Sequence, residues 1–204
     1  MRVKIFAEPL TEAILNLYEN EDNDYIIAVD HACLTLKEKN IPIDLAIGDF
    51  DSVTKDERKE IESYAKETEL YKAKKDYTDT YLAVTRALYI EHDEITLYGG
   101  VGKRLDHTLA NLDLLLLGNI SIQTDDALIY TLDPGQYTIE NGFDFISFFA
   151  LEDVKNLSLS GFKYPLTYFN LDRFDPLCVS NEGEGNIAFD EGCLLVIHQN
   201  EKST

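Results

Sequence analysis

A short apolar segment, Ile43–Ile47, runs into Gly48-Asp49-Phe50-Asp51-Ser52 and then into a polar, helix-favouring stretch. This order predicts a strand, a turn and a helix. Open α/β sheets bind ligands at the carboxyl ends of their strands, where two carboxylates two residues apart can converge on one cation. Oxygen ligands on a short turn suit Mg²⁺, which also takes oxygens from substrate phosphates. The segment therefore predicts phosphate chemistry with a metal held by Asp49 and Asp51.

Other interpretations of this turn stay open. Its carboxylates can simply cap the following helix through hydrogen bonds to backbone amides. In a calcium-binding EF-hand loop, the ligands would be Asp49, Asp51, Glu57 and Glu60. Thr54, however, replaces the glycine that such a loop needs at its sixth position. A non-enzymatic acidic metal-binding module is a further possibility, although it has no need of the cationic glycine turn found later in the chain.

The segment Asp49–Val53 also resembles the Asp-x-Asp-x-Thr/Val motif of haloacid-dehalogenase-like phosphohydrolases. Enzymes of that class need further metal-binding acids in a downstream Gly-Asp motif. The only Gly-Asp pair of this chain is Gly48-Asp49 itself. The phosphohydrolase interpretation is therefore the runner-up for the function.

The charge of the chain limits its partners. The 204 residues include 38 acidic and 18 basic side chains, which gives a net charge of −20. Such a chain lacks the basic face that nucleic acids require, and an anionic membrane surface repels it. Nucleotide binding remains compatible with this charge because a metal and a few local cations can offset the repulsion. The candidate cations are Lys72, Lys74, Lys75, Lys103 and Arg104.

The cysteines and the N-terminus indicate the compartment. Cys33, Cys178 and Cys193 contain no Cys-x-x-Cys pair and leave one thiol over in any disulfide scheme, so we expect small buried hydrophobic side chains. The N-terminus has no long apolar segment, and no stretch reaches 18 apolar residues. We expect a cytoplasmic protein in a reducing environment.

The chain divides into two parts with different patterns of strand-like and helix-like segments. Residues 1–124 alternate strand-like and helix-like segments, which predicts an α/β domain with a Rossmann-like parallel sheet covered on both faces. The clearest helices are expected at Asp79–Ile90 and Leu105–Leu117, the latter with a buried run of leucines. The expected strands are Arg2–Phe6, Tyr25–Asp30, Leu45–Gly48, Glu69–Tyr71, Glu94–Tyr98 and Ile120–Gln123.

Residues 125–204 instead carry short strand-like runs separated by glycine and proline turns. This pattern of short strands and turns predicts a β-sandwich domain. The expected strands are Ala127–Thr131, Gln136–Ile139, Phe143–Phe149, Asn186–Phe189 and Leu194–His198.

Two further motifs carry polar side chains at the starts of helices. In Lys75-Asp76-Tyr77-Thr78-Asp79-Thr80, either Asp76 or Thr78 can cap the helix, and its carboxylates can add to an oxygen cage. The segment Tyr98–Thr108 leaves a strand, turns through three glycines and enters a helix. It is neither a P-loop nor a Rossmann fingerprint. Its Lys103 and Arg104 still make it a candidate phosphate site, because glycine lets the backbone approach phosphates.

Together these segments resemble the thiamine pyrophosphokinase family. The matching pieces occur in order over nearly the whole chain: Ile43–Ser52, Lys75–Thr80, Gly102–Asn111, Val179–Glu182 and a terminal hairpin ending in Gly192–Ile197. The resemblance implies transfer of pyrophosphate from ATP to the hydroxyl of thiamine, giving thiamine diphosphate and AMP. It also implies a homodimer, with thiamine bound between the α/β domain of one chain and the sandwich of its partner.

The resemblance also implies roles for individual residues. The Mg²⁺ ligands it implies are Asp49, Asp51 and Asp79. The nucleotide contacts that it implies are Asp30, Ser52, Asp76, Thr78, Arg104 and His107. Lys103 is added to them because it lies in the glycine turn that is a candidate phosphate site. Ser180 and Asn181 are implied to contact the aminopyrimidine of thiamine. Because a carboxylate can accept the hydroxyl proton, Asp79 and Asp106 are both candidates for the catalytic base.

The chain departs from the family at three points. His31-Ala32 replaces the Gly-Gly that follows the first aspartate of the family, and Tyr77 replaces a common glutamine. The chain also contains no tryptophan, so an aromatic contact to thiamine must come from tyrosine or phenylalanine. The chemistry otherwise agrees with the residues, since pyrophosphoryl transfer depends on charge neutralisation and in-line positioning. Thiamine is a cation, so an acidic protein attracts it.

Overall fold

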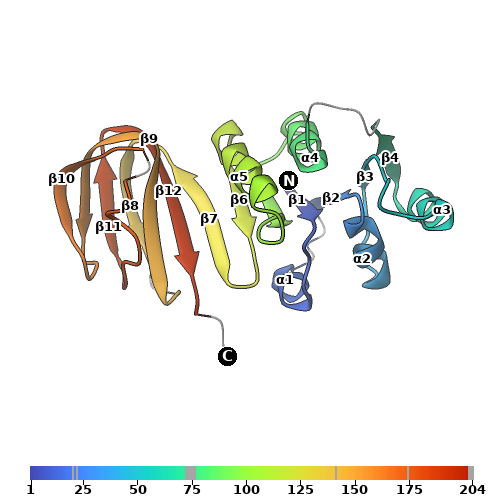
Figure 1. Cartoon of the computed structure of the whole chain (residues 1–204), viewed down its shortest axis with the longest axis horizontal. Coiled ribbons are helices and arrows are strands. Elements are labelled where there is room, and N and C mark those ends of the chain that lie inside the picture. Colours follow the sequence, from blue (N-terminus) through green and yellow to red (C-terminus); the bar gives the residue numbers. More distant parts are fainter. Residues whose placement is uncertain (20, 22, 72–76, 141, 174, 202–204) are drawn as a thin grey trace. The chain divides into compact units, whose positions relative to one another are not determined.

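The computed structural model describes residues 1–204 except for 20, 22, 72–76, 141, 174 and 202–204. The chain forms two compact units, Met1–Asp125 and Asp126–Thr204. The fold is a mixed, sheet-rich α/β fold (Figure 1).

In the described part of the first unit, six parallel strands pair in the order β4-β3-β2-β1-β5-β6. Successive strands from β1 to β4 are added on one side of β1, whereas β5 and β6 are added on the other side. The direction of winding therefore reverses between β1 and β5, and ligands of open α/β sheets bind outside such a switch point. The strands are β1 (Arg2–Ala7), β2 (Asp24–Val29), β3 (Leu45–Gly48), β4 (Glu67–Leu70), β5 (Glu94–Gly99) and β6 (Ile120–Gln123).

Helices cover both faces of this sheet, with α1 and α2 on one face and α4 on the other (Figure 1). Phe6, Ile26 and Ala28 pack in one buried cluster with Leu36 of α2 and Ile61 of α3. The helices are α1 (Glu12–Leu17), α2 (Ala32–Glu38), α3 (Lys55–Tyr64), α4 (Asp79–Leu88), α5 (Leu105–Asp113) and the 3₁₀ helix η1 (Leu114–Leu117).

Helix α3 begins inside the segment that an EF-hand loop would need. The Thr54 hydroxyl accepts a hydrogen bond from the Glu57 amide, and the Glu57 carboxylate accepts one from the Thr54 amide. This capping box satisfies the first turn of the helix and occupies Glu57. Glu60 pairs with Lys37 instead. The structure therefore does not favour an EF-hand, because Glu57 caps α3 and Glu60 pairs with Lys37 of α2.

The second unit is built from antiparallel strands. The long strand β9 pairs with β12 over its first half and with β10 and β11 over its second half, while β7 and β8 pair with β12 and β11. Phe148, Leu159 and Val196 belong to its buried core. The strands are β7 (Ala127–Leu132), β8 (Gly135–Ile139), β9 (Phe145–Ser160), β10 (Leu166–Leu171), β11 (Gly185–Phe189) and β12 (Glu191–Gln199).

The predicted strands of the first half agree with β1–β6 to within two residues at each end. Three predictions differ from the structure. Strand β9 continues beyond Phe149 to Ser160, and β10 was not predicted. The expected helix Leu105–Leu117 divides into α5 and η1, in which Leu116 and Leu117 are exposed.

All three cysteines are free and buried, as predicted for small hydrophobic side chains. Within the described residues, none of the helices combines the length and the apolar character needed to cross a lipid bilayer.

Candidate functional site

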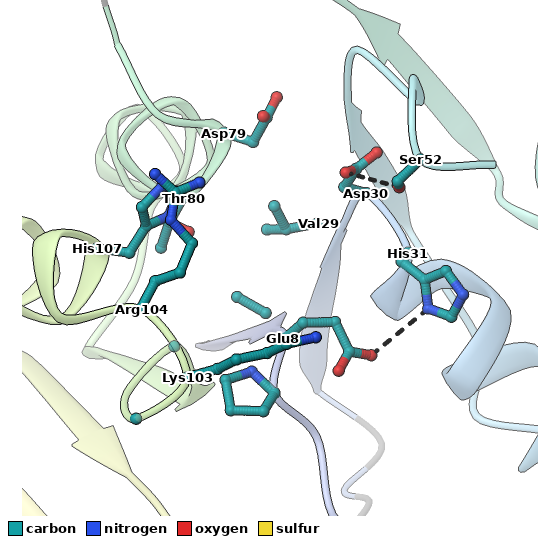
Figure 2. A pocket seen from close by; sticks show the side chains of 14 residues that line it. Glu8, Val29, Asp30, His31, Ser52, Asp79, Thr80, Lys103, Arg104 and His107 are labelled. Atoms are coloured by element: carbon teal, nitrogen blue, oxygen red, sulfur yellow. Dashed lines mark hydrogen bonds and ion pairs between the residues drawn. The ribbon is translucent and has the colours of Figure 1, made fainter.

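A cavity of about 570 Å³ opens in the first unit at the carboxyl edge of its sheet (Figure 2). Its wall comes from the segments that follow β1, β2, β3 and β5, and from the first turns of α4 and α5. This is the edge at which the sequence predicts the site. The lining includes Glu8, Asp30, His31, Ser52, Asp79, Thr80, Gly100, Gly102, Lys103, Arg104 and His107.

Three carboxylates gather at this edge. One oxygen each of Asp30, Asp49 and Asp51 lies within 4.8 Å of the others. The Asp51 amide donates a hydrogen bond of 3.1 Å to Oδ1 of Asp49. Between these two residues, Phe50 is buried with a positive φ of 54°, so its packing fixes the turn that presents both carboxylates.

Asp30 is the most constrained of the three. Its Oδ2 accepts a hydrogen bond of 3.0 Å from the Ser52 hydroxyl, whereas its buried Oδ1 has no partner among the described residues. Burial raises the pKa of Asp30, and the negative charges of Asp79, Asp49 and Asp51 raise it further, against the lowering effect of the Ser52 hydrogen bond. An unpartnered buried oxygen beside two more carboxylates is a donor set that fits a hard divalent cation.

The position of Asp30 depends on a glycine in the neighbouring strand. The Asp30 amide donates a hydrogen bond of 2.9 Å to the carbonyl of Ile47. A Cβ at Gly48 would lie 3.3 Å from the backbone and Cβ of Asp30. Glycine at position 48 therefore allows the ends of β2 and β3 to approach closely, which brings Asp30 to Asp49 and Asp51.

The predicted ligand Asp79 lies in the cavity wall at the start of α4 (Figure 2). It is not one of the three grouped carboxylates, although its charge acts on Asp30. Its neighbour Thr78 caps the helix, since the Thr78 hydroxyl accepts a 3.1 Å hydrogen bond from the Tyr81 amide. Asp76, with Lys72, Lys74 and Lys75, lies outside the described residues.

The basic side chains Lys103 and Arg104 and the imidazole of His107 line the cavity at the start of α5. Arg104 binds Asp106 with two hydrogen bonds, from Nε to Oδ1 at 3.2 Å and from Nη2 to Oδ2 at 2.6 Å. This pairing lowers the pKa of Asp106 to about 2. Asp106 is consequently a weak proton acceptor in this arrangement.

The glycine turn before α5 is held by side chains of the helix itself. Gly100 and Gly102 have positive φ values of 71° and 122°. The Gly102 amide donates a 3.1 Å hydrogen bond to the Thr108 hydroxyl, which in turn donates to the Arg104 carbonyl. The buried Asn111 amide donates a 2.7 Å hydrogen bond to the Gly100 carbonyl. The backbone of the turn is thus fixed before any ligand binds.

In the second unit, Ser180 and Asn181 differ in accessibility. Ser180 is exposed and has a positive φ of 59°. Asn181 is only 2% exposed, and its side-chain oxygen accepts hydrogen bonds from the amides of Tyr164 and Glu182. Its side-chain nitrogen donates to the Tyr164 carbonyl at 2.9 Å. The polar atoms of Asn181 are therefore engaged with the backbone of the loop before β10.

The residues of this first-unit site that the sequence did not predict include Glu8 and Asn111, and His31 and Thr80 also line the cavity. Glu8 lines the cavity directly after β1, and applying the strand-end rule to Arg2–Phe6 would have found it. Asn111 was included in a matching segment without a role, because nothing in a sequence indicates that an asparagine faces the carbonyl of a glycine eleven residues earlier.

Comparisons with known proteins agree over both units. The family model for the thiamin pyrophosphokinase catalytic domain matches residues 17–124, and the model for its vitamin B1 binding domain matches residues 136–194. The thiamine pyrophosphokinase of Bacillus subtilis (strain 168) is 40% identical over an alignment of 187 residues, and the match covers 86% of this chain and 87% of that protein.

Solved structures show the same similarity. The crystal structure of thiamine pyrophosphokinase from Bacillus subtilis is 34% identical with a TM-score of 0.85 and covers 98% of this chain and 100% of that one. A thiamin pyrophosphokinase family protein from Enterococcus faecalis is 30% identical, also with a TM-score of 0.85, over 99% and 100% of the two chains. The thiamin pyrophosphokinase of Candida albicans, at 16% identity and a TM-score of 0.76, shares the fold.

Proposed function

The chain belongs to the thiamin pyrophosphokinase family, and from this premise we propose how its residues divide the reaction between them. The chain is an enzyme that transfers the pyrophosphoryl group of ATP to the hydroxyl of thiamine, giving thiamine diphosphate and AMP. We assign nucleotide binding and catalysis to a Rossmann-like domain, residues 1–124. We assign thiamine binding to a β-sandwich domain, residues 125–204.

The metal in this proposal is Mg²⁺, held by Asp49, Asp51 and Asp30. The observation that carries it is the convergence of these carboxylates, together with the unpartnered buried oxygen of Asp30. When bound, the metal would neutralise charge on the phosphates of ATP. Asp79 remains a proposed further ligand, because it lines the same cavity and its charge acts on Asp30.

The cations at the start of α5 are proposed to hold the phosphates. Lys103, Arg104 and His107 line the same cavity as Asp30, so a phosphate chain placed between them meets positive charge. Arg104 is already oriented by Asp106. Because that pairing makes Asp106 a weak base, we assign the hydroxyl proton of thiamine to Asp79 rather than to Asp106, in a state in which Asp79 is not bound to the metal.

For thiamine, we propose contact with Ser180 and an indirect role for Asn181. Ser180 presents a hydroxyl at the surface of the second unit, and Asn181 holds the adjacent loop by hydrogen bonds to Tyr164. The active unit is proposed to be a homodimer in which thiamine meets the second unit of one chain and the cavity of the other. The three buried free thiols suit the reducing cytoplasm, where we place the protein.

The test of this proposal is product identity. The purified protein, supplied with ATP, Mg²⁺ and thiamine, should form AMP and thiamine diphosphate in equal amounts, as measured by chromatography. Omission of Mg²⁺ should abolish both products. Formation of ADP with thiamine monophosphate, or release of phosphate without thiamine, would overturn the assignment and favour a phosphohydrolase.

A further inference from the structure

Glu8 is a carboxylate of the cavity that the metal and phosphate assignments leave unused. It follows β1 and lines the cavity, and its side chain is 42% exposed. It does not belong to the group formed by Asp30, Asp49 and Asp51. Its position beside β1 places it at the strand where the winding of the sheet reverses.

Neighbouring groups hold this carboxylate in place (Figure 2). Its Oε1 accepts a hydrogen bond of 3.2 Å from the Thr35 hydroxyl and lies 3.7 Å from Nδ1 of His31. Its Oε2 accepts a hydrogen bond of 3.0 Å from the Leu10 amide. A carboxylate oxygen can accept two hydrogen bonds through its lone pairs, and this side chain is 42% exposed, so the group can still accept one from a ligand in the cavity.

The chemistry of the group limits which part of ATP it can meet. An ionised carboxylate repels phosphate, and the phosphates have Lys103 and Arg104 on the same cavity wall. A carboxylate accepts hydrogen bonds and donates none, so its natural partner is a neutral donor. The neutral donors of ATP are the ribose hydroxyls and the adenine amino group, and both lie in its nucleoside half.

We propose that Glu8 accepts a hydrogen bond from the nucleoside half of ATP and thereby sets the nucleotide preference of the enzyme. Thr35 and His31 act as positioning residues, because each contacts the carboxylate oxygen Oε1. This inference rests on the proposed function in one respect only, namely that the cavity binds ATP.

The test measures binding without turnover. Isothermal titration calorimetry with Mg²⁺ and no thiamine compares ATP with 2′-deoxy-ATP, 3′-deoxy-ATP and purine riboside triphosphate, which lacks the amino group. The wild-type protein should bind ATP at least about 10-fold more tightly than one of these analogues, as expected for a hydrogen bond to a charged acceptor. The analogue that loses affinity identifies the donor as a ribose hydroxyl or the amino group.

Variants connect this preference to Glu8. Glu8→Ala should bind ATP and the discriminated analogue equally well, and Glu8→Gln should keep part of the preference because it retains one acceptor oxygen. Thr35→Val should weaken the preference. Glu12→Ala is the matched control, since Glu12 is an exposed carboxylate of α1 paired with Lys39.

Two results would overturn the inference. One is a wild-type protein that binds all four nucleotides equally well, and the other is a preference that persists in a folded Glu8→Ala protein, as judged by circular dichroism. Failure of the inference is distinguishable from failure of the proposed function. If the wild-type protein binds all four nucleotides equally well but still forms AMP and thiamine diphosphate, only the role of Glu8 is refuted. If the nucleotide preference depends on Glu8 but no thiamine diphosphate forms, only the assigned reaction is refuted.

Discussion

The Ser52 hydroxyl donates a hydrogen bond of 3.0 Å to Oδ2 of Asp30, and this contact ties the turn after β3 to the end of β2. The bond uses one oxygen of Asp30 and leaves the other, Oδ1, buried without a partner among the described residues. Ser52 therefore orients the carboxylate that completes the group with Asp49 and Asp51.

Substitution of Ser52 by alanine tests this orientation. Loss of a hydrogen bond that positions a ligand carboxylate typically lowers metal affinity by about 10-fold or more. Ser52→Ala should accordingly raise the Mg²⁺ concentration for half-maximal activity by about 10-fold, with the fold intact. Ser63→Ala is the control, because the Ser63 hydroxyl bonds a helix carbonyl on the exposed face of α3. An unchanged Mg²⁺ requirement in Ser52→Ala would contradict this role.

Asp51→Asn tests the metal group itself. Metal stabilisation supplies several kcal/mol of transition-state free energy, so turnover should fall by roughly 10²-fold or more. The fold should survive, because the substitution removes one of several crowded negative charges. Steady-state kinetics and a thermal melt provide the two measurements. Asp56→Asn, on exposed α3, should keep full activity, and near-wild-type turnover of Asp51→Asn at low Mg²⁺ would refute the ligand assignment.

Asn111→Ala tests the support of the glycine turn. The substitution removes the 2.7 Å hydrogen bond to Gly100 and leaves its carbonyl without that donor. A lost buried hydrogen bond costs about 1–3 kcal/mol. The free energy of unfolding in urea should fall by about this amount, and the KM for ATP should rise because the turn lines the cavity. Asn119→Ala, which loses an exposed hydrogen bond to Asp93, should change neither quantity measurably.

His198 makes the stability of the second unit sensitive to acid. Burial lowers the pKa of His198, whose Nε2 lies 3.1 Å from the Tyr130 hydroxyl. The unfolded chain, in which the pKa of histidine is about 6.5, then binds the proton more readily than the folded chain. The contribution of neutral, buried His198 to the free energy of unfolding is therefore fully present above about pH 6.5. It is lost as the pH falls through the lower pKa of the folded state.

The corresponding measurement is the urea midpoint between pH 8 and pH 5. His198→Gln cannot titrate in this range, so its midpoint should fall less than that of the wild-type protein. His92→Gln controls for the loss of a histidine elsewhere in the chain. An equal fall for wild type and His198→Gln would show that other groups govern the acid sensitivity.

Mixing inactive chains tests the proposed homodimer. Asp51→Asn impairs the cavity of the first unit, and Asn181→Ala impairs the loop of the second unit. If each site joins the first unit of one chain to the second unit of its partner, mixed dimers contain one intact site. Random pairing should then restore up to about a quarter of wild-type activity. Sites confined to single chains would restore none.

The strands of the first unit were predictable because their hydrophobic runs are short and end in polar turns. Leu45–Gly48, for example, is buried throughout and is bounded by Asp44 and Asp49. The grouping of Asp30 with Asp49 was harder to predict from the sequence, because it requires that β2 and β3 be neighbours in the sheet. Which parallel strands become neighbours depends on how the connecting helices pack and on the close approach of the two backbones at Gly48. The alternation of apolar and polar residues within a strand contains neither kind of information.

The second unit was harder to predict for local reasons. The middle of β9 contains Glu152, Asp153 and Lys155, which interrupt the apolar pattern at the point where its pairing with β12 shifts register. Identical residues at 114–117 have no periodicity, so the sequence could not show that η1 buries only its first two leucines. The family resemblance implies a thiamine contact for Asn181, whereas the structure shows its side-chain amide bonded to the backbone of Tyr164.

Strand β9 has a consequence for how the second unit opens. Its first part pairs with β12 and its last part with β10 and β11, so β9 takes part in three of the five strand pairings within the described part of the unit. Opening either set requires displacement of the same strand. Slow amide hydrogen exchange should therefore appear at similar rates along Phe145–Ser160 and its partners, as a single cooperative unit that opens as a whole.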